Sequence, residues 1–172
     1  MANDQTPRMK RGFTLIELLL YVGIAGFLVF IFGNFLFLLL TSRTKSQTID
    51  EVNQQARYAM QLMLQSIRNA QTINAPGVGA TSFSLSLDVP DPTKDPIVFD
   101  LSGGALRMSE GLGSPIPLTS SRVLVSDLTF QNLSRPNTPG TIRIQFTLEY
   151  VNPENRNEYR HSKIFSGSAS LR

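Results

Sequence analysis

Residues 13–40 read FTLIELLLYVGIAGFLVFIFGNFLFLLL, and this stretch decides the fold at the amino end of the chain. Glu17 is its only charged side chain, and the 23 positions from Leu18 to Leu40 carry no charge. As an α-helix those positions would be about 35 Å long, which matches a bilayer hydrocarbon core of roughly 30 Å crossed with some tilt. The stretch therefore predicts a membrane-spanning helix rather than the core helix of a soluble domain.

Basic residues before the span indicate its orientation. The first 12 residues hold Arg8, Lys10 and Arg11 against one acid, Asp4, whereas the rest of the chain has 13 basic and 12 acidic residues. By the positive-inside rule we expect a single-pass protein of the cytoplasmic (inner) membrane, with a cytoplasmic amino end and an extracytoplasmic carboxyl-terminal part. Two basic residues soon after the span oppose this orientation. Because the net charge of +3 lies mostly in the leader, it gives no indication of nucleic-acid binding.

The span does not have the features of an ordinary secretory signal. Such a signal has an apolar run of about 7–15 residues followed by a small-residue cleavage site. Here the run has 28 residues and is followed by TSRTKS, whereas the small residue, Gly12, precedes it. The chain also has no cysteine, which excludes disulfides, a thiol nucleophile and cysteine-ligated metal.

The segment KRGFTLIELLLYVGIAG, residues 10–26, resembles the amino end of type IV pilins and type II secretion pseudopilins. The resemblance implies that a prepilin peptidase cleaves after Gly12 and that Phe13 becomes the N-methylated new terminus. It also implies that Glu17 is the glutamate that guides subunit docking. A glycine at the cut site suits this chemistry because it lets the backbone lie extended in the peptidase.

Two readings of Glu17 remain open. In the first, Thr14 and Glu17 form a capping box at the helix start, where a negative charge is favourable. In the second, Glu17 pairs with the Phe13 ammonium of a neighbouring subunit, which would offset the insertion cost of a carboxylate and set the axial register of a filament.

A second, amphipathic pattern follows the span. Apolar residues recur at three- and four-residue steps, namely Ile49, Val52, Ala56, Ala59, Met63, Ile67 and Ala70, with Met60 beside them. This periodicity predicts that one helix continues from Thr14 to Ile73. Within the span, Gly23 and Gly26 either allow close helix approach or are merely tolerated. Gly33 and Asn34 mark a weak point, at which we do not expect melting.

From residue 74 onward the sequence reads as β-structure. Phe83, Leu85 and Leu87 alternate with polar residues, and SGG at 102–104 separates two apolar runs as in a hairpin. Further strands are expected within 122–133, which is long or bulged, 141–151 and 159–172. The fold class is α+β: a long helix packed on a small antiparallel sheet, the ladle of pilins. The expected segments are a cleaved leader (1–12), a transmembrane assembly helix (13–40), its amphipathic continuation (41–73) and an extracytoplasmic β-rich domain (74–172).

No residue set indicates catalysis. His161, the sole histidine, is expected in the middle of a strand, and Asp100 or Asp127 would reach it only by folding. We predict that the chain is not an enzyme. It lacks a Gly-rich phosphate loop and a histidine metal pair.

The segment SLDVPDPTKDPIVFD, residues 86–100, is the candidate metal site. Asp88, Asp91 and Asp95, with Asp100, would offer carboxylates to Ca²⁺; the alternative is that they serve turns. We otherwise expect no cofactor. Asn132-Leu-Ser134 is a glycosylation sequon, a triplet that also arises by chance.

These observations favour a structural subunit. The family resemblance implies a minor pilin or pseudopilin of the J or W type, with prepilin peptidase, other pilin subunits, an inner-membrane assembly platform and lipid as partners. One alternative is a membrane-anchored extracytoplasmic binding module, either a tip adhesin or a substrate receptor. Another is an anchored enzyme that never polymerises.

Overall fold

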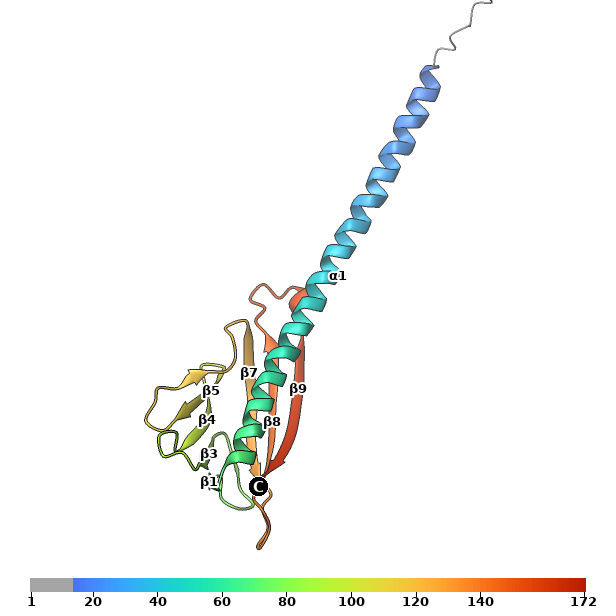
Figure 1. Ribbon diagram of the computed structural model, residues 1–172. Helices are drawn as coiled ribbons and strands as arrows, with labels where there is room; N and C mark the ends of the chain where they lie inside the picture. Colours follow the sequence, from blue (N-terminus) through green and yellow to red (C-terminus); the bar gives the residue numbers. More distant parts are fainter. Residues whose placement is uncertain (1–13) are drawn as a thin grey trace, which may run out of the picture. The chain divides into compact units, whose positions relative to one another are not determined.

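The computed structural model describes residues 14–172. Within these residues one long helix, α1 (Leu15–Asn69), precedes nine β-strands and a short 3₁₀ helix, η1 (Asn157–Tyr159) (Figure 1). The predicted α+β class is confirmed. The chain divides after Ser42 into two compact units, and each is considered by itself. The first contains the apolar start of α1, and the second contains the remainder of α1 and all the strands.

In the second unit, the predicted amphipathic stripe of α1 is the buried one. Val52, Ala56, Ala59, Met63 and Ile67 have no exposed surface. One turn earlier, the buried position is Thr48 rather than its half-buried neighbour Ile49. The Thr48 hydroxyl donates to the carbonyl of Thr44 at 3.0 Å, so its polar atom is satisfied inside the helix.

The helix ends before the expected boundary. We predicted that it would reach Ile73, but it ends at Asn69, and β1 (Thr72–Ala75) begins three residues later. Thr72 and Ile73 are β-branched and pair with Asp88 and Leu87 of β3 (Leu85–Asp88). The pairing of these residues with β3, more than ten residues further along the chain, therefore ends the helix, although the apolar pattern alone predicted that it would continue.

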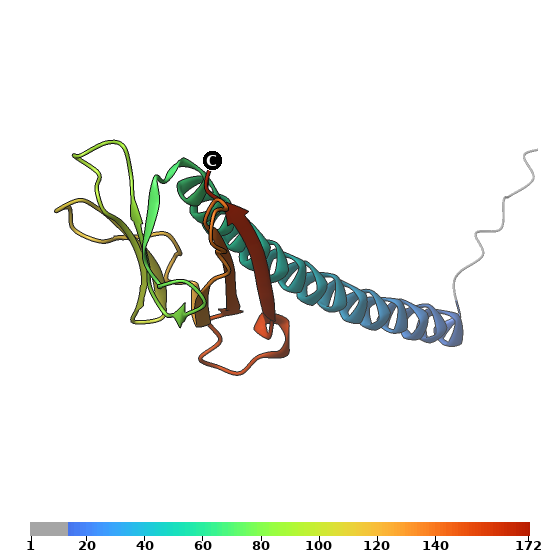
Figure 2. The same ribbon diagram turned by 90° about the horizontal axis from the view of Figure 1, so that it is seen from below.

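The predicted single sheet is divided into two antiparallel sheets. The five-stranded sheet has the order β1-β3-β4-β5-β6, in which the remaining strands are β4 (Ile97–Ser102), β5 (Ala105–Glu110) and β6 (Ile116–Pro117). The four-stranded sheet has the order β2-β7-β8-β9, formed by β2 (Thr81–Ser82), β7 (Val123–Asn132), β8 (Thr141–Tyr150) and β9 (Ser162–Ser170). Figure 2 shows the two sheets beside each other at the carboxyl-terminal end of α1. They meet where the amide of Val125 in β7 donates to the carbonyl of Gly104 at 2.8 Å.

Several local predictions are confirmed and two are wrong. The SGG turn joins β4 to β5, and β7 carries the expected bulge, a register shift between Ser126 and Thr129. Phe83 does not share the buried face of Leu85 and Leu87, because it precedes β3 and is 75% exposed. His161 is not in mid-strand, because the turn after β8 includes η1 and β9 starts only at Ser162.

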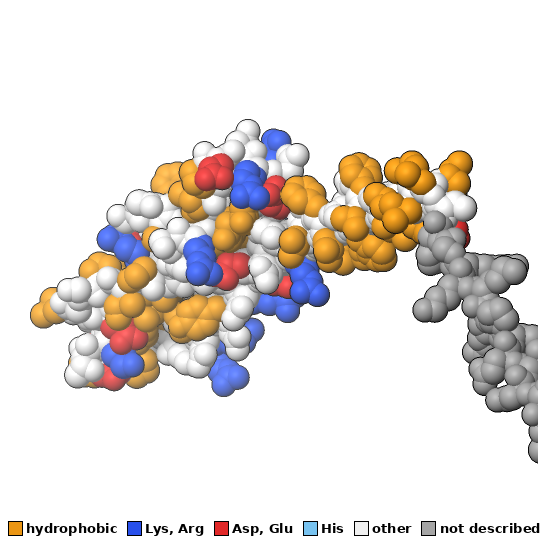
Figure 3. All heavy atoms as spheres, turned by 90° about the horizontal axis from the view of Figure 1, so that it is seen from above, with side chains coloured by type: hydrophobic (Ala, Val, Ile, Leu, Met, Phe, Trp, Pro, Cys, Tyr) orange, Lys and Arg blue, Asp and Glu red, His pale blue; other side chains and the backbone are white. Residues whose placement is uncertain are grey.

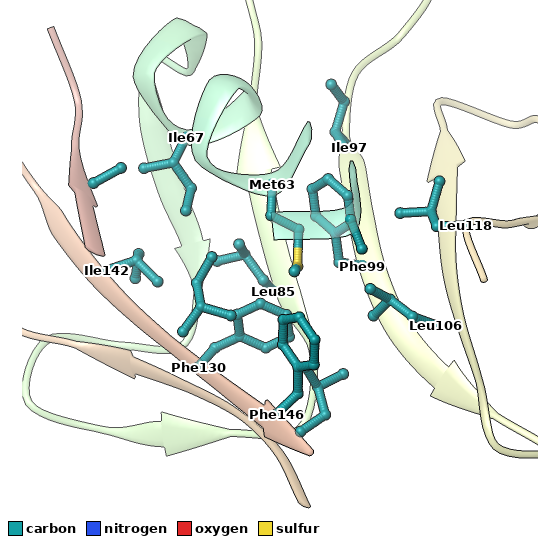
Figure 4. Close-up of a cluster of buried hydrophobic side chains, with 14 of the residues drawn as sticks. Met63, Ile67, Leu85, Ile97, Phe99, Leu106, Leu118, Phe130, Ile142 and Phe146 are labelled. Carbon is teal, nitrogen blue, oxygen red and sulfur yellow. The ribbon is translucent and has the colours of Figure 1, made fainter. Parts of the chain in front are cut away.

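The core of the second unit lies between the helix and both sheets. Met63 and Ile67 of α1 stand among Phe130, Ile142 and Phe146 of the four-stranded sheet and Ile97, Phe99 and Leu106 of the five-stranded sheet (Figure 4). These side chains belong to one contiguous buried cluster. Burial of this amount of apolar surface is what holds the second unit together, since the chain has no disulfide.

Candidate functional site

The start of α1 is capped by Thr14. The Thr14 carbonyl accepts from the amides of Glu17 and Leu18 at 3.1 and 3.2 Å, and its hydroxyl oxygen accepts from the Glu17 amide at 3.4 Å. This is half of the predicted capping box. The other half is not formed, because in the described part of the chain the Glu17 carboxylate accepts from Tyr21 and not from the Thr14 amide.

Tyr21 is a contact that the sequence reading missed. Its hydroxyl lies one helical turn beyond Glu17 and donates to Glu17 Oε1 at 3.5 Å. The i, i+4 spacing places both side chains on one face and was the signal that could have revealed the pair. At 3.5 Å the bond is long. A carboxylate has about four acceptor sites, so Glu17 can accept further donors.

Glu17 differs from its surroundings in burial. It is half-buried, whereas Leu15, Ile16 and Leu18 expose 78%, 75% and 57% of their surface. The two other residues named for processing, Gly12 and Phe13, lie outside the described residues. The structure therefore describes the position of Glu17 but not that of Phe13, the residue predicted to supply its partner.

The helical surface around Glu17 is almost entirely apolar. Large hydrophobic side chains from Leu15 to Leu40 are between 42% and 78% exposed. Figure 3 shows these side chains covering the first part of α1, while charged side chains gather on the other unit. In residues 14–172, α1 is the one helix long and apolar enough to cross a membrane, with a mean hydropathy of 2.5 over its most apolar window. Water is a poor solvent for such a surface, so lipid or other apolar helices must cover it.

Polar residues inside the apolar stretch are satisfied by the helix itself. The side-chain amide of Asn34 donates to the carbonyl of Phe30 at 2.8 Å, and the hydroxyl of Thr41 donates to that of Phe37 at 3.1 Å. The helix passes through Gly33 and Asn34 without interruption, as we expected. An ideal Cβ on Gly23 or Gly26 would meet nothing within 4 Å, so both interpretations of these glycines remain open.

The four candidate calcium ligands are engaged with separate partners. Asp88 accepts from the Thr72 hydroxyl at 3.2 Å, and Asp95 accepts from the Val89 amide at 3.3 Å. Within residues 14–172 no three acidic or histidine side chains form a group that could hold a metal. The turn interpretation fits these contacts better than a shared metal.

The other two aspartates also have local roles. Asp91 Oδ1 accepts from the amide and the hydroxyl of Thr93 at 3.0 and 2.7 Å. These hydrogen bonds hold the pKa of the Asp91 carboxyl below its ordinary value. Asp100 accepts two hydrogen bonds from Arg107, at 2.9 and 2.7 Å, and this partner raises the pKa of the Arg107 guanidinium.

The residues considered for catalysis are not brought together as a triad. Asp100 is bound to Arg107, and Asp127 accepts from the hydroxyls of Ser126 and Thr147. The carbonyl of His161 accepts from the Tyr150 amide, and its Nε2 is buried without a partner among the described residues. This arrangement gives no nucleophile and base in contact.

The sequon asparagine has a structural role. Asn132 is 2% exposed, its side-chain amide donates to the carbonyl of Pro76 at 2.8 Å, and its Oδ1 accepts from the Ser134 amide at 3.0 Å. A glycan cannot be attached to this nitrogen while the fold is intact.

Comparison with known proteins matches one region of the chain. Residues 7–32 match the family model described as the prokaryotic N-terminal methylation motif. No curated protein and no solved structure matches. The matched residues include Gly12, Phe13 and Glu17 together with the first part of the exposed apolar helix. At its amino end the chain therefore carries the methylation motif that is characteristic of type IV pilins and pseudopilins.

Proposed function

We propose that this chain is a minor subunit of a type IV pilus or a type II secretion pseudopilus. Prepilin peptidase cleaves it after Gly12 and methylates Phe13, and the mature protein assembles through its amino-terminal helix. The observation that carries the proposal is the lone half-buried carboxylate of Glu17 within an otherwise apolar, exposed helical surface. The methylation motif at residues 7–32 supports the same reading.

The energetics of Glu17 favour a partner beyond its own helix. A carboxylate costs about 2.5–3.5 kcal/mol at the centre of a bilayer on insertion scales, and less near the end of a span. The Thr14 hydroxyl caps the helix and contributes on the order of 1 kcal/mol. Tyr21 adds a long hydrogen bond from an uncharged donor. The ammonium of Phe13 on a neighbouring subunit would supply the opposite charge that these two contacts lack.

Such a pairing builds a filament. Each processed subunit has one terminal ammonium and one carboxylate four residues later, so head-to-tail addition satisfies each ammonium with the carboxylate of the next subunit. A heterologous contact that does not close on itself gives an open helical assembly. The apolar coat from Leu15 to Leu40 is then covered by lipid before assembly and by other helices after it.

The same reading gives the partners and the location. We expect contact with prepilin peptidase, with other pilins or pseudopilins and with an inner-membrane assembly platform. The precursor crosses the inner membrane once, with its amino end in the cytoplasm, and the mature protein then enters the filament. The size of the β-domain favours a minor subunit of the J or W type, which primes or caps assembly. The role is structural, and we propose neither an enzymatic activity nor a cofactor for it.

The proposal is tested by separating processing from assembly. Glu17→Leu is expected to insert and to be cleaved, but to be absent from sheared filaments. Gly12→Leu is expected to stay at full length, and Ile16→Leu, which changes an exposed apolar neighbour conservatively, should behave as the wild type. Mass spectrometry of the amino terminus reports cleavage and methylation, and immunoblots of the filament fraction report incorporation. Normal incorporation of Glu17→Leu would refute the pairing, and a methylated Phe13 terminus in Gly12→Leu would refute the cut site.

A further inference from the structure

The sheet edges in residues 14–172 differ greatly in length. In the five-stranded sheet, the edge strands are β1, with four residues and an irregular register, and β6, with two residues that include Pro117. In the four-stranded sheet, one edge is β2, with two residues. The other edge is β9, with nine residues in unbroken register with β8. Short strands, proline and irregular pairing protect an edge against further strands, and β9 has none of these features.

The outward-facing backbone groups of β9 follow from its register. Just before and after the strand, the carbonyl of His161 accepts from the Tyr150 amide and the Leu171 amide donates to the carbonyl of Gly140. In an antiparallel ladder every second residue bonds to the neighbouring strand. The odd-numbered residues of β9 therefore bond to β8. The amides and carbonyls of the even-numbered residues point away from the sheet, namely those of Ser162, Ile164, Ser166, Ser168 and Ser170.

A groove runs beside this edge, between β9 and α1. It has a volume of about 470 Å³, and its apolar surface is formed by Met60, Leu64 and Phe165. The helix approaches the strand closely at Gly167, where an ideal Cβ would lie 2.8 Å from the Met60 sulfur. A strand added to β9 would lie about 4.8 Å further out, and every second side chain would face the helix and enter the groove.

The groove carries positive charge. Arg57 and Arg68 line it from α1, and both are exposed. Neither forms an ion pair within the described chain. Arg68 lies eleven positions after Arg57, which places the two residues roughly 16 Å apart along the helix axis and on nearly the same side of the helix. Lys163 lies at the start of β9, with its ammonium 5.3 Å from the centre of the Phe165 ring. A strand entering here meets apolar surface flanked by two guanidinium groups.

We infer that β9 is a docking edge for an extended, acidic segment of a different polypeptide. The segment adds as a fifth strand to the four-stranded sheet through main-chain hydrogen bonds, the mode known as β-augmentation. Of its side chains that face the helix, the middle one is apolar and the ones on either side are acidic. The two acidic residues are four to six positions apart, so that their carboxylates reach Arg57 and Arg68. A second copy of this chain does not fit, because β9 has no acidic residue and pairing two copies would add one cationic groove to another.

This inference goes beyond the proposed helical assembly and does not depend on it. The test uses the full-length chain in detergent micelles. The probe is a labelled peptide of about nine residues, Thr-Thr-Glu-Thr-Val-Thr-Glu-Thr-Thr, and its partner probe has Lys in place of each Glu. Fluorescence anisotropy should show saturable binding of the acidic peptide and about tenfold weaker binding of the basic one. Hydrogen exchange should slow at the amides of Ile164, Ser166 and Ser168 when the acidic peptide is bound.

Two variants separate the backbone from the charges. Ser166→Pro removes one outward amide without removing a bond to β8, and should abolish binding, whereas Ser166→Thr keeps that amide and should bind as the wild type. The double substitution Arg57→Glu with Arg68→Glu should invert the preference between the two peptides. It changes exposed helical positions and tests the proposal even if the proline variant fails to fold. Equal binding of both peptides, binding without protection of the three amides, or self-association through β9 in place of peptide binding would each overturn the inference.

Discussion

We expect Asn132→Ala to lower the free energy of unfolding of the second unit substantially, although a residue at the end of a strand usually contributes little. Asn132 is the last residue of β7, and its side chain joins two separate segments. Its amide donates to the buried carbonyl of Pro76, and its carbonyl oxygen accepts from the amide and the hydroxyl of Ser134. Its backbone amide and carbonyl also bond to Ala80 and Gly79. The side chain therefore fastens the turn after β1 to the turn before β8.

The expected loss follows from these contacts. An unsatisfied buried carbonyl at Pro76 costs about 1–3 kcal/mol, and each lost, partly buried bond to Ser134 costs about 0.5–1.5 kcal/mol. Because the two Ser134 donors regain some solvation, the total is about 2–4 kcal/mol. With a urea dependence of about 2 kcal/mol per molar, the unfolding midpoint should fall by about 1–2 M.

The assay is pulse proteolysis of the full-length protein in micelles across a urea series. Gln54→Ala, which changes an exposed polar position of α1, is the control and should lie within about 0.5 kcal/mol of the wild type. A midpoint for Asn132→Ala that coincides with this control would refute the assigned role of the side chain.

Asn132→Asp tests the direction of the hydrogen bond to Pro76. One oxygen of the new carboxylate would keep the two Ser134 donors, which lower its pKa, while the other would face the Pro76 carbonyl. We expect burial together with this repulsion to outweigh the donors and to raise the pKa of the Asp in the folded state. Below the unfolded-state pKa of about 3.9 the Asp is protonated in both states, so the folded state incurs no penalty for a buried charge. As the pH rises from there through the folded-state pKa, the free energy of unfolding falls, because the unfolded state ionises more readily. The deficit against the wild type should therefore be largest at neutral pH and should shrink toward pH 4. A deficit independent of pH would show that the Asn132 amide does not face the carbonyl.

Two further predictions concern the core and a turn. Met63→Ala removes a fully buried side chain between the two sheets and should cost about 2–5 kcal/mol by urea denaturation, whereas Tyr58→Ala, at a 57% exposed position of the same helix, should cost much less. For Asp91, whose carboxyl pKa lies below its ordinary 3.8, the stabilisation is complete above that pH and is lost as the pH falls through the lowered value. Asp91→Asn should therefore flatten the acid side of a plot of thermal midpoint against pH, and an unchanged acid side would contradict this.

Much of the fold follows from local patterns in the sequence. The apolar stripe of α1 and the alternation along β8 depend on helix and strand periods, and both identify the buried side chains correctly. The end of α1 depends on a contact distant in sequence, the pairing of Thr72 and Ile73 with β3, and no local period records it. The division into two sheets also depends on contacts distant in sequence. A short strand shows the same alternation of apolar and polar residues whichever strand it pairs with.

The candidate site was predictable where the chemistry is confined to one helical turn. The Thr14 cap and the Tyr21 contact both depend on spacings of three or four residues around Glu17. The aspartates between 88 and 100 illustrate the opposite case, since their spacing permits both a metal site and a set of turns. Folding sends them to separate partners, among them Thr72 and Arg107, which lie outside the segment that raised the question.

The two units have surfaces of different chemistry, and this difference limits where partners can bind. The start of α1 offers no exposed charge between Leu18 and Leu40, so contacts through that surface gain little specificity from charge. In the filament that we propose, Glu17 is the group that would define the register. The edge of β9 has the reverse character, since its outward amides and carbonyls fix strand register through hydrogen bonds, while Arg57 and Arg68 select the charge of the partner. A protein that joins a helical assembly by one surface can thus hold an unrelated extended segment by the other. The two activities should be separable, with Glu17→Leu retaining peptide binding and the Arg57→Glu, Arg68→Glu double variant retaining processing.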